Sequence, residues 1–233
     1  MVRCRRGNPA HGREPGYGWA AGLLTLSAGA VNAWGFLALG GAFTSVMTAN
    51  SAMIGIGLGS EDLALGRLAG LAVLCYVLGA AGGSWAVVGA RRASRSAGIG
   101  FLLLEVVLLW AVAVWWLSVD GHPSGWARTA MLGTVSAAMG CQNAGVRAVL
   151  GTHVTTAYLT GLLTQAVVDA VTLRRFQRRA LTTMGLLILG AATFAILERL
   201  MHGFAPLLGP VFVTAASLIL HLAPRNRRGA ASY

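Results

Sequence analysis

The side chains best placed to do chemistry in this sequence are amides, hydroxyls and one arginine inside or beside apolar stretches. An amide or hydroxyl left without a partner in hydrocarbon costs several kcal/mol, so such a set must face one another, water or a ligand. The alternative is that they link helices, at roughly 0.6 kcal/mol per contact. We predict a substrate-binding site made by Asn32, Thr44, Thr48, Asn50, Gln142, Asn143, Arg147, Thr155, Thr156, Thr160 and Gln165.

Three ionisable residues lie at or near membrane depth. Arg147 follows Asn143 by four residues, so on a helix both share a face, and the guanidinium could clamp a carboxylate or phosphate. The alternative is an interface arginine that obeys the positive-inside rule. Asp169 and Glu105 are the candidate proton-coupling carboxylates. Asp169 could instead pair with Arg147 or lie at the interface, and Glu105 could be buried in the bundle or reach back to Arg95.

Recognisable enzyme, metal and cofactor motifs are missing from the sequence. A phosphate-binding P-loop needs a lysine, and the chain has none. Cys4, Cys75 and Cys141 have no CxxC spacing and indicate neither a disulfide framework nor a metal site. We therefore expect a protein without catalytic activity, metal or cofactor. An intramembrane enzyme that uses Asp169 or His153 is the alternative left open.

The composition places these residues in a membrane. Hydrophobic residues make up 56% of the 233 residues, charged residues only 11%, and the mean hydropathy is +0.67. Soluble domains carry roughly 25% charged residues, so we expect an integral protein of the lipid bilayer. The net charge of +11 sits in short runs between apolar stretches, a topogenic pattern that argues against a nucleic-acid partner. Every basic residue is arginine, which indicates a GC-rich, bacterial genome and hence a plasma-membrane protein.

The expected fold is an all-α polytopic membrane bundle. A helix needs about 20 mostly apolar residues to span the bilayer. The expected spans are Trp19 to Gly41, Leu63 to Ala90, Gly98 to Val119, Ala127 to Val149, Leu181 to Leu200 and Pro206 to Leu222. The shorter, more polar stretches Phe43 to Gly59 and Val154 to Leu173 either re-enter, giving six spans, or cross, giving eight. Arginine placement favours six spans with both termini cytoplasmic.

The two halves of the chain resemble each other at a spacing close to 112 residues. Asn32 aligns with Asn143, and Thr48 aligns with Thr160. Three crossings per half make the repeat inverted, whereas four would make it parallel. The expected organisation is a cytoplasmic tail (1–18), a first membrane repeat (19–119), a linker (120–126), a second membrane repeat (127–222) and a cytoplasmic tail (223–233).

Two segments carry a family resemblance: AVNAWGFLALGGAFTSVMTAN and MGCQNAGVRAVLGTHVTTAYLTGLLT. They resemble the signature regions of the YoaK-like family, also called DUF1275, of bacterial multi-pass membrane proteins. The resemblance implies a membrane location and this architecture. The family usually shows Asp-Ala and Met-Thr-Gly-Asn in the first region, where this chain has Asn32-Ala33 and Met47-Thr48-Ala49-Asn50. The missing carboxylate argues against proton coupling at that position.

These patterns favour a secondary transporter or permeation pathway for a small polar solute, an anionic one included. Its site would lie near the membrane midplane, between the first and fourth spans and the two polar segments. The alternative, from a different class, is a non-transporting membrane scaffold or assembly partner whose polar residues only join helices. Glycine-rich faces would allow a homo-oligomer without demanding one.

Overall fold

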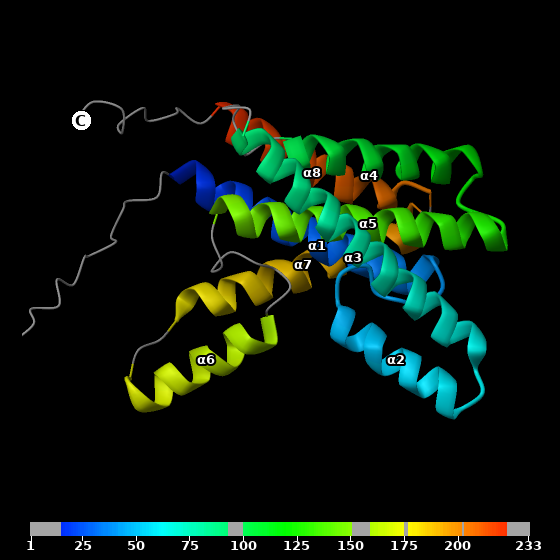
Figure 1. Cartoon of the computed structure of the whole chain (residues 1–233), viewed down its shortest axis with the longest axis horizontal. Coiled ribbons are helices and arrows are strands. Elements are labelled where there is room, and N and C mark those ends of the chain that lie inside the picture. Colours follow the sequence, from blue (N-terminus) through cyan, green and yellow to red (C-terminus); the bar gives the residue numbers. More distant parts are fainter. Residues whose placement is uncertain (1–14, 93–99, 151–158, 175–176, 202, 223–233) are drawn as a thin grey trace, which may run out of the picture.

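The computed structural model describes residues 15–92, 100–150, 159–174, 177–201 and 203–222. Within these ranges every regular element is a helix (Figure 1). The helices are α1 (Pro15–Ala38), α2 (Met47–Gly59), α3 (Leu63–Arg92), α4 (Gly100–Ser118), α5 (Gly125–Leu150), α6 (Leu159–Thr172), α7 (Arg178–Leu200), the 3₁₀ turn η3 (Ala205–Leu207) and α8 (Leu208–Leu222). The expected all-α fold is confirmed for this part of the chain.

Five helices in the described ranges are long and apolar enough to cross a membrane. They are Gly18–Ala38, Leu63–Gly89, Gly100–Ser118, Arg178–Leu200 and Ala205–Leu222. The sixth expected span, α5, has 26 residues and is long enough, but it carries Arg128, Gln142, Asn143 and Arg147 and is not among the five. This apolar bundle is the architecture of an integral membrane protein.

The expected boundaries are mostly right to within a few residues. Helix α1 begins earlier than Trp19, at Pro15, which is a favourable residue for a first helical position because its missing N–H would lack an intrahelical partner anyway. The first polar stretch, Phe43 to Gly59, is helical only in part, because residues 39–46 are not helical and α2 begins at Met47. The first residues of the second polar stretch, 154–158, lie outside the described residues.

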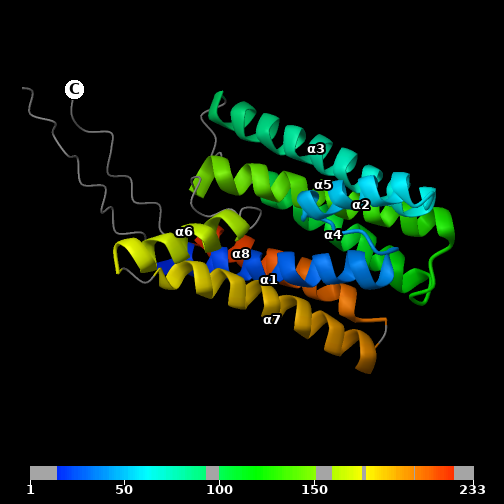
Figure 2. The same ribbon diagram turned by 90° about the horizontal axis from the view of Figure 1, so that it is seen from below.

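The long helices form two groups of three (Figure 2). In one group α1 packs against α7 and α8, and in the other α5 packs against α3 and α4. The short helices lie on the outside, α2 against α3 and α6 against α7. Each group thus combines one long helix from one half of the chain with two from the other half. The groups meet mainly where α4 contacts α8, with a smaller contact between α1 and α5.

Glycines allow the closest helix approaches inside each group. A Cβ atom on Gly29 of α1 would overlap the carbonyl oxygen of Leu187 in α7, and one on Gly190 would overlap that of Leu26. In the other group Gly79 of α3 and Gly140 of α5 lie equally close to the opposite backbone. Small residues at such positions bring two backbones together, which is how helices associate where lipid removes the hydrophobic driving force.

A few side chains join the two groups. The indole rings of Trp34 in α1 and Trp116 in α4 meet edge to face at a centroid distance of 5.7 Å and an interplanar angle of 88°, and both are almost fully buried. Trp110 Nε1 of α4 donates to Thr214 Oγ1 of α8 over 3.1 Å. The seam between the groups is therefore held by buried aromatic packing and single hydrogen bonds.

Neither short helix runs from one end of the molecule to the other (Figure 1). Where α1 ends the chain turns back, α2 begins near the middle of the molecule, and it ends where α3 begins. Helix α6 also begins near the middle of the molecule. It ends toward the end of the molecule where α1 begins, next to the start of α7. In both views the N-terminal ends of α2 and α6 face each other.

Candidate functional site

The loop before α2 is folded around the side chain of Asn32, a residue of α1. Asn32 Oδ1 accepts from the backbone N–H of Thr44 (3.1 Å) and of Ser45 (3.0 Å), and from Thr44 Oγ1 (3.2 Å). Asn32 Nδ2 donates to Ser45 Oγ (2.7 Å) and to the carbonyl of Ala28 (2.8 Å). A single amide therefore satisfies much of the polar backbone of a segment that leaves its helix inside an apolar bundle.

A second amide closes the same loop from the other side. Asn50 Nδ2 in α2 donates to the carbonyl of Phe43 (2.6 Å), and the N–H of Phe43 donates to Asn50 Oδ1 (3.0 Å). Gly40 and Gly41 have φ values of +114° and +91°, which a residue with a Cβ rarely adopts, so they permit the sharp turn after α1. The loop thus depends on two glycines and two asparagines that the sequence places at its edges.

These contacts define what the first-half candidates do in this structure. Asn32, Thr44 and Asn50 are buried, and the hydrogen-bonding groups of both amides are directed at the loop. Thr48 is different, because it is exposed at the second residue of α2. Their assignment to a substrate site stays a prediction, in which Asn32 and Asn50 hold the loop and Thr48 is the side chain free to meet a solute.

In the second half one amide reaches across the seam between the helix groups, and the other bonds within its own group. Gln142 is 1% exposed, and its Nε2 donates to the carbonyl of Leu24 in α1 over 3.5 Å. Its Oε1 is buried and has no hydrogen-bond partner among the described residues. Asn143 is also buried and forms a side-chain hydrogen bond with Tyr76 of α3. Gln142 is thus the only one of the predicted site residues that joins α5 to α1 through a hydrogen bond given for the described ranges.

The remaining described second-half candidates are exposed. Arg147 is exposed in the last turn of α5. Thr160 and Gln165 are exposed on α6, none of whose residues is buried. Thr155 and Thr156 lie outside the described residues. The structure therefore separates the described candidates into a buried set on α1, the α1–α2 loop, α2 and α5 and an exposed set on the short helices and at the end of α5.

The two candidate coupling carboxylates have very different surroundings. Asp169 of α6 accepts from Gln165 Nε2 (2.7 Å) and from Gln177 Nε2, so two amides hold it at the edge of the bundle. Glu105 of α4 is fully buried, and neither of its oxygens has a hydrogen-bond partner among the described residues. Of the alternatives for Glu105, the structure shows the acid buried within the bundle. A charge there would be expensive without a partner, which is why such acids are functional candidates in membranes.

Sequence reasoning missed three residues that shape this region: Phe43, Ser45 and Tyr76. Ser45 and Phe43 could have been suspected only from their place between two glycines and the start of a helix. Tyr76 gives no local signal, because its partner Asn143 is distant in the chain. Within the described ranges no group of three or more His, Cys, Asp or Glu side chains is arranged to hold a metal ion.

The helices and the polar segments between them define the class: a multi-helix integral membrane protein with two short outer helices that begin near the middle of the molecule's length. The family model of the protein of unknown function DUF1275 matches residues 20–220, and the chain belongs to that family. The resemblance noted in the two sequence segments is thereby confirmed. Comparisons with curated proteins and with solved structures found no match.

Proposed function

We propose that this protein is a secondary transporter or permeation pathway for a small polar solute, an anionic one included, built as a three-plus-three inverted repeat. The observation that carries the proposal is the matched glycine packing. Gly29 and Gly140 are 111 residues apart, as are Gly79 and Gly190. Gly29 meets the backbone of α7 and Gly140 that of α3, so the α1–α7 contact has a counterpart in the α5–α3 contact.

The other helix contacts also occur in matched pairs, in which each helix of one half is replaced by its counterpart from the other half. Contact of α1 with α8 corresponds to contact of α5 with α4, and contact of α2 with α3 corresponds to contact of α6 with α7. Together with six crossings, this correspondence supports an inverted rather than a parallel repeat, because each half then contains an odd number of spans. Inverted repeats with interrupted segments at equivalent positions are common among secondary transporters, whose sites lie between the halves.

The short helices supply a reason for the site to bind polar or anionic groups. The first N–H groups of a helix have no partner within it and carry partial positive charge. Val46 caps α2 without a side-chain hydrogen bond, so these groups are available to water or a solute near the middle of the molecule. In the proposal Thr48 and Thr160 orient the solute, Arg147 recognises charge, and Glu105 or Asp169 couples binding to protons.

The remaining features of the proposal concern the surroundings of the protein. The lipid bilayer is that of a bacterial plasma membrane, with both termini on the cytoplasmic side, where most of the arginines then lie. The end of the bundle that holds the α1–α2 loop and the α4–α5 connection then faces outward. Exposed apolar side chains on α3 and α7, such as Leu74 and Ile188, then face lipid or a second copy of the chain.

A thermal-stability screen of the purified protein against small polar metabolites tests the proposal. A ligand that binds only the folded state raises stability by about 2.7 kcal/mol at a hundredfold excess over its dissociation constant. We expect a stabilising solute whose effect is lost in Arg147→Ala. Arg199→Ala is the matched control, because Arg199 is also an exposed arginine in the last turn of a long helix. No stabilising solute in a broad panel at pH 5 and pH 8 would contradict the proposal.

One observation favours the second candidate, a non-transporting scaffold. The amides of Asn32 and Asn50 are committed to holding the α1–α2 loop, which is what polar residues do when they only join parts of a bundle. In a scaffold the polar interior would be dry, whereas a transporter needs water at the N-terminal ends of α2 and α6. The two candidates therefore differ in a property that labelling can measure.

A further inference from the structure

A cavity of about 270 Å³ opens at the end of the bundle where α1, α4 and α7 end and α5 begins. Its walls include Ala38 at the end of α1, Trp116 in the last turn of α4, Arg128 in the first turn of α5 and Glu198 in the last turn of α7. Helices α4 and α5 belong to one helix group, and α1 and α7 belong to the other. The cavity therefore lies across the seam between the two groups.

Trp116 supplies a buried hydrogen-bond donor to the wall of this cavity. The residue is 2% exposed, and its Nε1 has no hydrogen-bond partner among the described residues. The edge-to-face contact with Trp34 holds the ring in place. Gly121 lies beside the ring with φ at +74°, and a Cβ atom there would stand 3.4 Å from Trp116 Nε1. The glycine thus leaves this edge of the indole uncovered, although a buried indole N–H normally has an acceptor.

Arg128 adds a positive charge to the cavity. No hydrogen bond or ion pair of its guanidinium is found within the part of the chain that the structure describes. The residue lies in the first turn of α5, a turn without acidic residues, where the helix dipole is positive as well. An indole N–H and a guanidinium can only donate hydrogen bonds. Both groups are therefore suited to a solute with acceptor oxygens and a negative charge.

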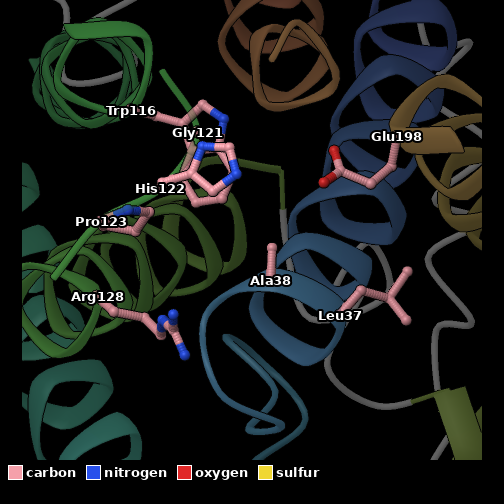
Figure 3. A pocket seen from close by; sticks show the side chains of 8 residues that line it. All are labelled: Leu37, Ala38, Trp116, Gly121, His122, Pro123, Arg128 and Glu198. Atoms are coloured by element: carbon pink, nitrogen blue, oxygen red, sulfur yellow. The ribbon is translucent and has the colours of Figure 1, made fainter. Parts of the chain in front are cut away.

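The opposite side of the cavity is formed by the other helix group (Figure 3). The two donors enter from α4 and α5, whereas Leu37 and Ala38 come from α1 and Glu198 comes from α7. Glu198 and His122 both take part in interactions within the described part of the chain, so neither is needed as a partner for the solute. A solute with an apolar end toward α1 would keep its negative charge on the side of the two donors, away from the carboxylate of Glu198.

We propose that this cavity binds a short-chain aliphatic carboxylate, with its oxygens on Arg128 and Trp116 Nε1 and its alkyl chain against Leu37 and Ala38. The inference rests on the proposed function and deepens it by naming the solute class and an outer site for it. Hydrogen bonds between a guanidinium and a carboxylate are charge-assisted, and the alkyl chain leaves water for an apolar wall. A cavity of about 270 Å³ lies below the roughly 300 to 1,000 Å³ of sites for drug-sized molecules, which suits a small solute.

Ligand-observed NMR titration of the full-length protein in detergent, at constant ionic strength, tests the inference. The probes are acetate, propionate and butyrate. The controls are propionamide, which keeps the shape of propionate without its charge, and propylammonium, which reverses the charge. We expect at least one carboxylate to bind and both controls to bind about tenfold more weakly or worse, because hydrogen bonds that involve a charged group are stronger by about that factor. Affinity should rise from acetate to butyrate as the chain covers more of the apolar wall.

Two substitutions remove the two proposed contacts. Arg128→Gln removes the charge and should weaken carboxylate binding about tenfold or more, whereas Trp116→Phe removes the N–H and keeps an aromatic ring, and should also weaken it. Arg199→Gln is the control for the first, because Arg199 is an exposed arginine that does not line the cavity. Trp34→Phe is the control for the second, because Trp34 is equally buried in the same ring contact but does not line the cavity. Both controls should leave the affinity close to that of the unmodified protein.

Arg128→Lys provides a further variant if Trp116→Phe does not fold. It keeps the positive charge and should retain more affinity than Arg128→Gln. Absence of carboxylate binding, equal binding of propionamide, or unchanged affinity in Arg128→Gln would overturn the inference. A solute that still stabilises Arg128→Gln and loses its effect in Arg147→Ala would overturn the inference at the cavity while leaving the proposed function in place.

Discussion

Replacing Gly29 by alanine should weaken the bundle by an amount that the glycine packing determines. A Cβ atom at Gly29 would lie 2.9 Å from Ala191 N and 3.0 Å from Leu187 C, and would overlap Leu187 O. Carbon and carbonyl oxygen normally stay about 3.3 Å apart, so α1 and α7 would have to separate by roughly 1 Å. Overpacking of this kind costs about 1 to 3 kcal/mol, and the better helix propensity of alanine returns about 0.8 to 1.0 kcal/mol. The expected net loss is about 0 to 2 kcal/mol.

Gly22→Ala is the matched control on the same pair of helices. Its Cβ would stand 3.6 Å from Leu186 Cδ1, an ordinary van der Waals contact, so this variant should be neutral or up to about 1 kcal/mol more stable. The free energy of unfolding, measured by titration with a denaturing detergent in mixed micelles, compares the two. Gly140→Ala should resemble Gly29→Ala, because it occupies the corresponding contact with α3. Equal stability of Gly29→Ala and Gly22→Ala would refute the close approach of α1 and α7.

Two further predictions concern buried polar side chains. Asn32→Ala leaves the N–H groups of Thr44 and Ser45 without their acceptor, at about 1 to 3 kcal/mol each, whereas Asn32→Asp keeps the acceptor and should cost less. Unfolding free energies of the two variants test this order, and an alanine variant as stable as the aspartate variant would show that the loop does not depend on the side chain. Glu105→Gln keeps the shape of a fully buried acid that has no described hydrogen-bond partner, so stability should change by less than about 1 kcal/mol. In proteoliposomes the same variant should lose stimulation of solute uptake by an imposed proton gradient, and persistence of that stimulation would exclude Glu105 as the coupling group.

Much of the architecture could be read from the sequence because lipid imposes a simple rule on it. Each spanning helix must satisfy its own backbone and present about 20 mostly apolar residues, so α3, α4 and α7 begin and end within three residues of the expected positions. The structure of the first polar stretch, Phe43 to Gly59, was harder to predict from the sequence. Its division into a loop and a helix depends on hydrogen bonds that the loop backbone donates to Asn32, which lies on another helix and gives no local signal.

The candidate site was less accessible to sequence reasoning than the fold. Amides at matched positions predict a polar interior, but the pattern does not say whether an amide meets a solute or the backbone of its own loop, as Asn50 does. The cavity at the far end illustrates the opposite difficulty. Arg128 and Glu198 each look like a solvated helix end, and only the packing of α5 and α7 brings both residues into the lining of one cavity (Figure 3).

Water accessibility at the N-terminal ends of the short helices tests the central claim most directly. Thr48 and Thr160 are exposed second residues of α2 and α6, so cysteine at either position, with Cys4, Cys75 and Cys141 replaced by serine, should react with a polar maleimide in the membrane. Leu74→Cys is the matched control, since Leu74 is 58% exposed on the apolar face of a spanning helix and should stay unlabelled. All three should react after denaturation. Labelling of Thr48→Cys and Thr160→Cys that is no faster than that of Leu74→Cys would contradict a hydrated pathway and favour the scaffold.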